Sequence, residues 1–380
     1  MDFELTPDQV SLQEGARRFA ESLNGDDVRQ GDDHQFLLEA WKRCASFGVQ
    51  GMCVPAEFGG GEADPITITV VLEALGYGCR DGGLLFSLNA HMWSCEVPLV
   101  NFASDELKHR YLPGLCDGSL IGVQAMTEPD SGSDAFSLST SARRVAGGYV
   151  LNGTKTFITN APVANVFIVF VTTDRELGFG GISAFVVDRN TEGLSVGKPF
   201  RKMGLRSSPM SELVFSDCEV GSDRLLGPEG AGMAIFTASM DWERSFILAS
   251  AVGTMERQLE RAVMYSRTRR QFGRPIGKFQ HVARRVVDMK IRLETARLLQ
   301  YRLSWLRTKG KPAAHESAMV KLYLSESYLQ SSLDAVQVHG AFGYMEDSGV
   351  EVDVRDAIGS RIYSGTSEIQ RNVIAHGMGL

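Results

Sequence analysis

Apolar residues recur every three or four positions through much of the C-terminal half of the chain. One series steps along residues 282–306 and stops at Gly310–Pro312, a combination that commonly ends a helix. A second series runs from Met319 to Val336 and stops before Gly340. Each series places one apolar stripe along a helix, and that stripe needs a partner to cover it. Two long helices of this kind, joined by a short link, predict a helical bundle.

Between about Leu120 and Val220 the pattern becomes strand-like. β-Branched or alternating runs bounded by turn residues predict strands at 149–158, 163–172, 182–187, 194–196 and 211–220. The first run contains Asn152-Gly153, a strong signal for a hairpin turn, so we expect the chain to reverse there. Several short strands at regular spacing predict a small barrel or sandwich.

The N-terminal region is predicted to be helical. Thr6 can cap a helix that begins at Pro7, and Gln9 completes a capping box. Apolar patterning predicts further helices near 34–47, 66–78 and 84–102. The order is therefore α, then β, then α. We expect an N-terminal helical domain at 1–120, a central β domain at 121–222 and a C-terminal helical bundle at 223–380.

Charge and cysteine usage exclude several classes of protein. The 380-residue chain carries a net charge of −7, which disfavours nucleic acid as the main partner. Its six cysteines form no CxxC pair and no zinc-like spacing with histidine, so no metal is predicted. The longest apolar run, at 166–171, is far too short to span a bilayer. The first residues lack a basic, then apolar, leader. We therefore expect a cytoplasmic protein without a membrane partner.

Two loops are rich in hydroxylated residues, at Thr127–Asp134 and Tyr363–Glu368. Backbone N–H and hydroxyl groups in such loops can bind polar ligand atoms. On composition alone, a surface turn and a helix cap at Ser367 are the more common interpretations. The glycine-rich motifs of Rossmann and P-loop nucleotide sites are absent from the sequence.

Glu243 is the candidate general base. It lies in a predicted helix beside the bulky apolar residues Trp242, Phe246 and Ile247. A carboxylate buried among such residues has a raised pKa, which suits proton abstraction. Most glutamates are solvent-exposed, however, so composition alone favours a solvated side chain.

A set of motifs spread in order along the whole chain resembles the acyl-CoA dehydrogenase family of flavoproteins. The motifs are Met126–Asp134, Gly153–Asn160, Gly204–Ser208, Gly227–Met233, Arg269–Ile276, Gln337–Gly340 and Tyr363–Arg371. Any one of them is weak evidence, but together and in this order they are specific. The resemblance also favours a ligand-binding role for the two hydroxyl-rich loops.

The resemblance implies an α+β multidomain fold: an N-terminal helical domain, a central β-barrel or sandwich domain and a C-terminal four-helix bundle. It implies FAD bound between the β domain and the bundle, with a neighbouring subunit of a homotetramer or dimer completing the site. The implied flavin-side residues are Met126, Thr127, Ser133, Phe157 and Thr159. The implied contacts to the diphosphate or adenine end, partly across the subunit interface, are Arg269, Phe272, Gln280, Gln337 and Gly340. Thr366 and Glu368 are implied to lie near the same cofactor.

The sequence departs from the family pattern at the catalytic base. Many members carry a glutamate directly before the Gly-Thr of the last motif, where this chain has Ser364. A second branch carries the base in an Asp-x-Glu-Arg context on the first long bundle helix, and Glu243 fits that context. Two smaller departures are Phe157, where many members have tryptophan, and Ala341, where a second glycine is common. The residues implied on the substrate side are Ser133, Asp241, Arg244, Tyr363 and Ser364.

The implied reaction is the dehydrogenation of an acyl thioester, an oxidoreductase reaction on CH–CH groups (EC 1.3). Glu243 would remove the α-proton while a β-hydride passes to flavin N5, with the Ser364 N–H helping to stabilise the carbonyl oxygen. The combination of Met240–Arg244 with Tyr363–Ser367 is most similar to dehydrogenases of secondary metabolism. These act on acyl or prolyl groups tethered to an acyl or peptidyl carrier protein.

Several alternatives stay open at the level of sequence. The thioester handle could be coenzyme A or a carrier protein, and the electron acceptor could be an electron-transfer flavoprotein or oxygen. An oxygen-using acyl thioester oxidase or flavin monooxygenase would share the same fold. A non-catalytic flavoprotein binding module is a further alternative, and an intact Glu243 argues against it. The sequence does not define the acyl group.

Overall fold

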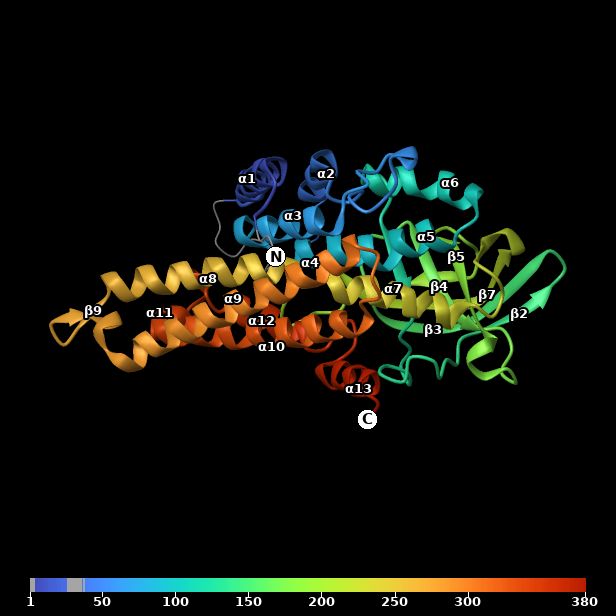
Figure 1. Cartoon of the computed structure of the whole chain (residues 1–380). Helices are drawn as coiled ribbons and strands as arrows, with labels where there is room; N and C mark the ends of the chain where they lie inside the picture. Colours follow the sequence, from blue (N-terminus) through green and yellow to red (C-terminus); the bar gives the residue numbers. More distant parts are fainter. Residues whose placement is uncertain (1–3, 26–35, 37) are drawn as a thin grey trace.

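The computed structural model describes residues 4–25, 36 and 38–380. Helices occupy the chain up to Cys116, strands dominate from Gly122 to Leu226, and helices return from Gly232. Figure 1 shows the long C-terminal helices extending away from the sheet, with the first helices lying along one side of them. The three-part layout predicted from the sequence is confirmed.

The N-terminal helices are set by clear capping signals. Thr6 caps the first helix, and the predicted capping box with Gln9 is present. Part of the helix predicted near 34–47 lies outside the described residues. The helix after Ser104 was not predicted, although Ser104 caps it and acidic residues fill its first turn. The elements are α1 (Pro7–Ser22), α2 (Leu38–Phe47), η1 (Ala56–Phe58), α3 (Pro65–Gly78), α4 (Gly82–His91), η2 (Met92–Glu96), α5 (Val97–Phe102) and α6 (Asp105–Cys116).

The central domain is built on an eight-stranded sheet in the order β6-β7-β3-β2-β4-β5-β8, with β1 paired in parallel to β4. Every residue of β4 is buried, which explains its continuous apolar run. The strands are β1 (Gly122–Ala125), β2 (Ser141–Val145), β3 (Gly148–Thr159), β4 (Val166–Thr172), β5 (Ile182–Asp188), β6 (Leu194–Val196), β7 (Met210–Gly221) and β8 (Leu225–Leu226), with η3 (Gly178–Gly181) and η4 (Ser222–Arg224) between them.

The predicted turn at Asn152-Gly153 is wrong. Both residues lie inside β3, which continues as one strand to Thr159. The pairing of β3 with β7 shifts register between Leu151 and Gly153, so the glycine belongs to a β-bulge, and its φ is +144°. The chain instead reverses at Gly147, between β2 and β3, where φ is +80°.

The C-terminal domain consists of long helices and confirms both predicted amphipathic segments. α9 and α10 extend two to five residues beyond the predicted apolar series at each end. The elements are α7 (Gly232–Phe246), α8 (Ala249–Thr268), β9 (Arg270–Gln271), β10 (Arg274–Pro275), η5 (Ile276–Lys278), α9 (Gln280–Thr308), α10 (Ala314–His339), α11 (Ala341–Tyr344), η6 (Glu346–Ser348), α12 (Val352–Ser360) and α13 (Ser367–Gly377).

Two negative findings concern the described residues alone. None of their helices combines the length and the apolar character needed to cross a bilayer. Among the same residues, no cluster of three or more His, Cys, Asp or Glu side chains is arranged to hold a metal ion.

Candidate active site

Glu243 lies on the buried face of α7, where only 8% of the residue is accessible to solvent. Its carboxylate accepts two hydrogen bonds from hydroxyl groups. The Oγ of Ser94 lies 2.8 Å from Oε2, and the Ser364 hydroxyl donates to Oε1. The carboxylate therefore joins three segments that are far apart in the sequence: η2, α7 and the loop before α13.

Burial is the main cause that raises the pKa of Glu243 above its ordinary value. The hydroxyls of Ser364 and Ser94 and the charges of Arg244 and Lys321 oppose this shift without cancelling it. A carboxylate with a raised pKa is a stronger proton acceptor once it is ionised. The expected buried carboxylate with a raised pKa is thus confirmed, whereas its role as the catalytic base stays a prediction.

Ser364 adopts a left-handed backbone conformation with φ +55°, which is unusual for a residue other than glycine. Gln370 donates to the carbonyl oxygens of both Ser364 and Gly365, at 3.1 and 2.9 Å. The Nζ of Lys321 donates to the Gly365 carbonyl at 2.6 Å. These contacts fix the loop in a shape that directs the Ser364 hydroxyl at Glu243.

Tyr363 packs against Phe86 of α4, with ring centroids 4.4 Å apart. The Lys321 ammonium lies 5.7 Å from the centre of the Tyr363 ring. Burial lowers the pKa of Lys321 to about 7, and the nearby charge of Arg244 adds to this effect. Tyr363 and Phe86 thus place aromatic rings near the carboxylate, and the Lys321 ammonium beside them loses its proton more readily than an exposed lysine does.

Arg244 and Asp241 flank the base on α7 but point to different surroundings. The Nε of Arg244 is buried and has no hydrogen-bond partner among the described residues. A buried donor left in this way is available to a ligand. Asp241 is instead engaged in the bundle, 2.9 Å from Arg307 and 2.8 Å from the Ser317 hydroxyl. Contact of Asp241 and Arg244 with a substrate stays a prediction.

The loop containing Met126 and Thr127 is anchored by a buried ion pair that we did not predict. Lys155 of β3 lies 2.7 Å from Glu128 and also donates to the Met126 carbonyl at 3.0 Å. The N–H of Thr156 donates to the Thr127 carbonyl at 2.8 Å. Lysine inside a strand and glutamate in the adjoining loop motif were visible in the sequence, but their pairing was not.

Phe157 lies within a second register shift of β3, between Lys155 and Ile158, and Thr159 lies just beyond it. Phe157 has φ +57° and 61% of its surface is exposed. Its ring is 5.7 Å from that of Phe200. Ser133 is also exposed, in the loop after β1. The β domain therefore presents an open aromatic face beside a hydroxyl-bearing loop.

The second group of predicted cofactor residues lies at the opposite end of the bundle. Arg269 directly precedes the β9–β10 hairpin, and Phe272 lies in its turn. Figure 1 shows this hairpin at the tip remote from the sheet, and 92% of Phe272 is exposed. Gln280 begins α9, Gln337 lies in the last turn of α10, and Gly340 directly follows α10. Along α10, the 16 residues between Lys321 and Gln337 correspond to about 24 Å. Within one chain, the structure does not bring this group to Glu243.

Thr366 and Glu368 begin α13. Thr366 caps the helix by accepting from the Ile369 N–H at 3.2 Å, so the cap suggested at Ser367 is displaced by one residue. The Ser367 hydroxyl donates instead to Glu326 at 2.7 Å. Glu368 is exposed in the first turn, 3.8 Å from Arg371. Both predicted residues therefore lie within a few positions of Ser364.

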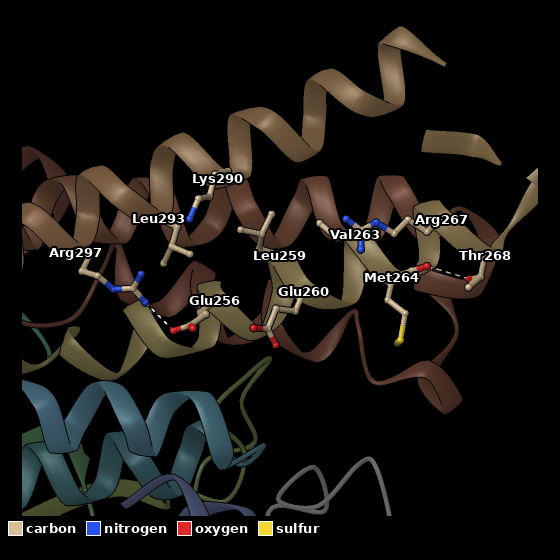
Figure 2. A pocket seen from close by; sticks show the side chains of 10 residues that line it. All are labelled: Glu256, Leu259, Glu260, Val263, Met264, Arg267, Thr268, Lys290, Leu293 and Arg297. Carbon is tan, nitrogen blue, oxygen red and sulfur yellow. Dashed lines mark hydrogen bonds and ion pairs between the residues drawn. The ribbon is translucent and has the colours of Figure 1, made fainter. Parts of the chain in front are cut away.

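A cavity of about 550 Å³ opens between α8 and α9 (Figure 2). It is crossed at one end by the ion pair of Arg297 with Glu256, at 2.6 Å. None of the predicted site residues lines it. The lining residues are Glu256, Leu259, Glu260, Val263, Met264, Arg267, Thr268, Lys290, Leu293 and Arg297.

Comparison with known proteins places this geometry in a family. Residues 6–119, 123–218 and 230–379 match the N-terminal, middle and C-terminal domains of acyl-CoA dehydrogenase. An L-prolyl-[peptidyl-carrier protein] dehydrogenase of Serratia sp. is 43% identical over 381 residues, covering 100% of this chain and 99% of the relative.

Two solved structures share the whole fold. The prolyl acyl carrier protein oxidase AnaB has a TM-score of 0.97 and 46% identity, covering 99% of this chain and 100% of AnaB. PigA, solved with FAD and proline, has a TM-score of 0.97 and 43% identity, covering 100% of both chains. The matches span all three regions of the fold. The chain therefore belongs to the acyl-CoA dehydrogenase family.

Proposed function

We propose that this protein binds FAD and dehydrogenates an acyl thioester, and that its substrate is a prolyl group tethered to a carrier protein. The observation that carries the proposal is the buried carboxylate of Glu243, held by two hydroxyls. The full-length relatives of this chain include enzymes named for prolyl carrier proteins. The assignment of a carrier protein and of a prolyl group is based on those relatives. The assignment of proton abstraction is based on the geometry of the site.

The residues of the β domain fit the flavin half of FAD. The exposed ring of Phe157 offers an apolar surface to an aromatic ring system, and the Met126–Thr127 main chain beside it is held by Lys155. The exposed guanidinium of Arg269 suits a diphosphate. Thr127 and Thr159 add hydroxyl groups that can bind polar edges. When bound, FAD supplies the acceptor for the hydride that leaves the substrate.

Glu243 takes the proton from the α-carbon of the thioester. Its pKa is raised by burial, so the carboxylate binds a proton more strongly than an exposed glutamate does. The hydroxyls of Ser94 and Ser364 restrict it to one orientation, which leaves little reorganisation for proton transfer. Its aromatic surroundings at Tyr363 and Phe86 exclude water from the reacting carbon.

The thioester carbonyl becomes negative as the α-proton leaves, so it needs a donor. The backbone N–H of Ser364 has no acceptor among the described residues. The left-handed conformation of Ser364, fixed by Gln370 and Lys321, holds that N–H in a constant position. We assign it to the carbonyl oxygen, where a preorganised donor stabilises developing charge. Arg244 lies next to Glu243 in α7, and its Nε has no partner among the described residues. We assign this donor to the arm that links the acyl group to its carrier.

The test is the visible absorbance of the FAD-loaded protein under anaerobic conditions. A peptidyl carrier protein loaded with L-proline should bleach the flavin band, whereas butyryl-CoA at the same concentration should not. Bleaching by butyryl-CoA alone would move the assignment to a CoA-dependent enzyme. If no thioester bleaches the band while FAD stays bound, the dehydrogenation itself is contradicted.

The relative AnaB, named as an oxidase, supports a second candidate in which oxygen is the electron acceptor. The alternative acceptor is an electron-transfer flavoprotein. Stoichiometric hydrogen peroxide during turnover in air, without any added acceptor, would support the oxidase. Turnover that requires an added one- or two-electron acceptor would support the dehydrogenase.

We further propose that the protein works as a homodimer or homotetramer. The two groups of cofactor residues lie at opposite ends of the bundle, so one FAD can contact both only if the distal group comes from a second chain. The outer face of α9 supports this arrangement, because exposed apolar side chains recur there in steps of four and seven. These residues are Val287, Ile291, Leu298 and Trp305.

A further inference from the structure

The helical path that runs from Gly82 to Phe102 widens for one turn at η2, which is a π-helix. The N–H of Val97 donates to the carbonyl of Met92, five residues earlier. Pro98 supplies the cause. It has no N–H, and its ring would collide with the carbonyl of Ser94, four residues earlier, in a regular α-helix. Single π turns of this kind recur at functional sites.

The π turn contains Ser94, whose hydroxyl points at the base. Its Oγ lies 2.8 Å from Oε2 of Glu243, while the Ser364 hydroxyl donates to Oε1. Ser94 and Glu243 are both buried. Each carboxylate oxygen therefore has its own hydroxyl donor, one from the N-terminal helices and one from the C-terminal loop.

Buried contacts on both sides hold the π turn in place. His91 accepts from the Gly122 N–H through Nδ1, at 3.0 Å, so its Nε2 carries the proton. That proton is directed at the buried Glu96, with Nε2 and Oε1 3.1 Å apart. Trp93 packs on Phe246 of α7, with ring centroids 5.0 Å apart. The Ser94 hydroxyl is consequently fixed relative to α7.

We propose that Ser94 is a positioning residue for the base: it fixes the orientation of the Glu243 carboxylate and stabilises its charged form inside the protein. This inference rests on the proposed function of Glu243 as the base. A hydroxyl donor favours the ionised carboxylate against the cost of burial, and it leaves the second oxygen to Ser364. After proton transfer the same hydroxyl can rotate and accept a hydrogen bond from the neutral acid.

Other charged or titratable groups also face Glu243. Arg244 contributes from α7 itself, Lys321 from α10 and Tyr363 from the loop before α13. These groups are unchanged when Ser94 is replaced. A shift that appears on replacing Ser94 therefore measures the hydroxyl rather than its neighbours.

The first experiment measures the anaerobic rate of flavin reduction by the prolyl carrier protein across pH. The rate rises with pH as Glu243 ionises. In Ser94→Ala the rising limb should move upward by about one to two pH units, because a hydrogen bond to a charged group is lost. Ser94→Thr retains the hydroxyl and should stay near wild type. Ser87→Ala is the matched control, since Ser87 is buried on α4 and its hydroxyl donates to Ser208.

The second experiment needs no turnover and no cofactor. It follows the thermal unfolding midpoint of the apoprotein across pH for Ser94→Ala, Glu243→Gln and the double variant. The pKa of folded Glu243 lies above its unfolded value, and losing Ser94 raises it further. The decrease in the unfolding midpoint of Ser94→Ala relative to the wild type should therefore become larger as pH rises and Glu243 ionises. That pH-dependent part should disappear in the Glu243→Gln background, where nothing titrates at this position.

The two experiments separate the inference from the function on which it rests. Coupling in the unfolding data without flavin reduction by any thioester would remove the proposed function and leave the Ser94–Glu243 contact intact. If flavin reduction in Ser94→Ala depends on pH as it does in the wild type, the positioning role is overturned. An equal, pH-independent loss of the midpoint in both backgrounds would overturn it as well.

Discussion

The Nζ of Lys155 and the Oε1 of Glu128 lie 2.7 Å apart, and both side chains are almost completely buried. Burial acts to raise the pKa of Glu128, but the charge and hydrogen bond of Lys155, with bonds from Ser139 and Thr140, outweigh it and lower that pKa to about 2. Lys155 also binds the Met126 carbonyl. The pair therefore connects β3 to the loop that we assign to the flavin.

Replacing Lys155 with methionine should destabilise the protein and weaken FAD binding together. The change leaves Glu128 as an unpaired buried charge, at a cost of about 3–5 kcal/mol in the free energy of unfolding. Chemical denaturation at pH 7 and retention of FAD during gel filtration measure the two effects. Adding Glu128→Gln removes the stranded charge and should recover part of the stability.

The exposed Lys309→Met is the control for Lys155, because Lys309 lies at the end of α9. The contribution of the Lys155–Glu128 pair to stability is also expected to be lost at low pH. The pKa of Glu128 is lower in the folded protein, so its contribution is complete above the unfolded value of about 4 and is lost as pH falls toward 2. A Lys155→Met protein with wild-type stability at pH 7 would show that the pair does not hold the loop.

Glu243→Gln should abolish most flavin reduction while the protein keeps its fold and its FAD. The amide preserves the size of the side chain but cannot accept the α-proton, and loss of a general base commonly costs at least about 100-fold in rate. Single-turnover bleaching of the flavin measures the effect. Glu106→Gln on the exposed start of α6 is the control. Bleaching of Glu243→Gln at the wild-type rate would mean that another group removes the proton.

Much of this site could be predicted from the sequence, because the information was local. The stripes on α9 and α10, the capping of α1 and the apolar neighbours of Glu243 all depend on residues within a few positions of one another. Asn152-Gly153 misled for the same reason: the dipeptide suits a tight turn, but pairing with the distant β7 turns it into a bulge. The local pattern gave no sign of that pairing.

The contacts that complete the site are non-local and escaped prediction. Ser94 reaches Glu243 across 149 positions and Ser364 across 121. Lys155 meets Glu128 across 27 positions. A lysine inside a strand was a signal that could have prompted a search for a partner. Pro98 could have indicated an irregular helix, but not which side chain the widened turn would direct at the base.

Lys321→Met should change how stability depends on pH. Burial lowers the pKa of folded Lys321 to about 7, below its unfolded value of about 10.4. The unfolded chain therefore binds more protons between these values, so wild-type stability should rise by up to about 4 kcal/mol as pH increases from 7 to 10. The variant should lack this rise, which urea unfolding at pH 7 and 9.5 measures.

Lys309→Met serves again as the control, since Lys309 is exposed at the end of α9. Lys321→Met should also loosen the Ser364–Gly365 loop, because the bond to the Gly365 carbonyl is lost. We expect slower flavin reduction with FAD still bound. Identical pH dependence in the variant and the wild type would mean that Lys321 keeps its ordinary pKa in the folded protein.

Ile291→Glu should break the proposed contact between subunits. Ile291 lies in the apolar series on the outer face of α9, and 57% of it is exposed in the isolated chain. A buried glutamate between two copies costs several kcal/mol, so the variant should dissociate toward monomers. It should also lose FAD, because Arg269 and Phe272 of the neighbouring chain would no longer reach the cofactor. Light scattering after gel filtration gives the mass, and the flavin absorbance gives the occupancy.

Leu177→Glu is the control for this change, because Leu177 is 64% exposed beside η3 in the β domain, far from α9 along the chain. It should leave both mass and flavin content unchanged. If Ile291→Glu becomes monomeric yet retains full FAD, one chain alone holds the cofactor and the distal residues serve another purpose. If the wild-type protein is itself monomeric with bound FAD, the apolar face of α9 is not a contact between copies of this chain.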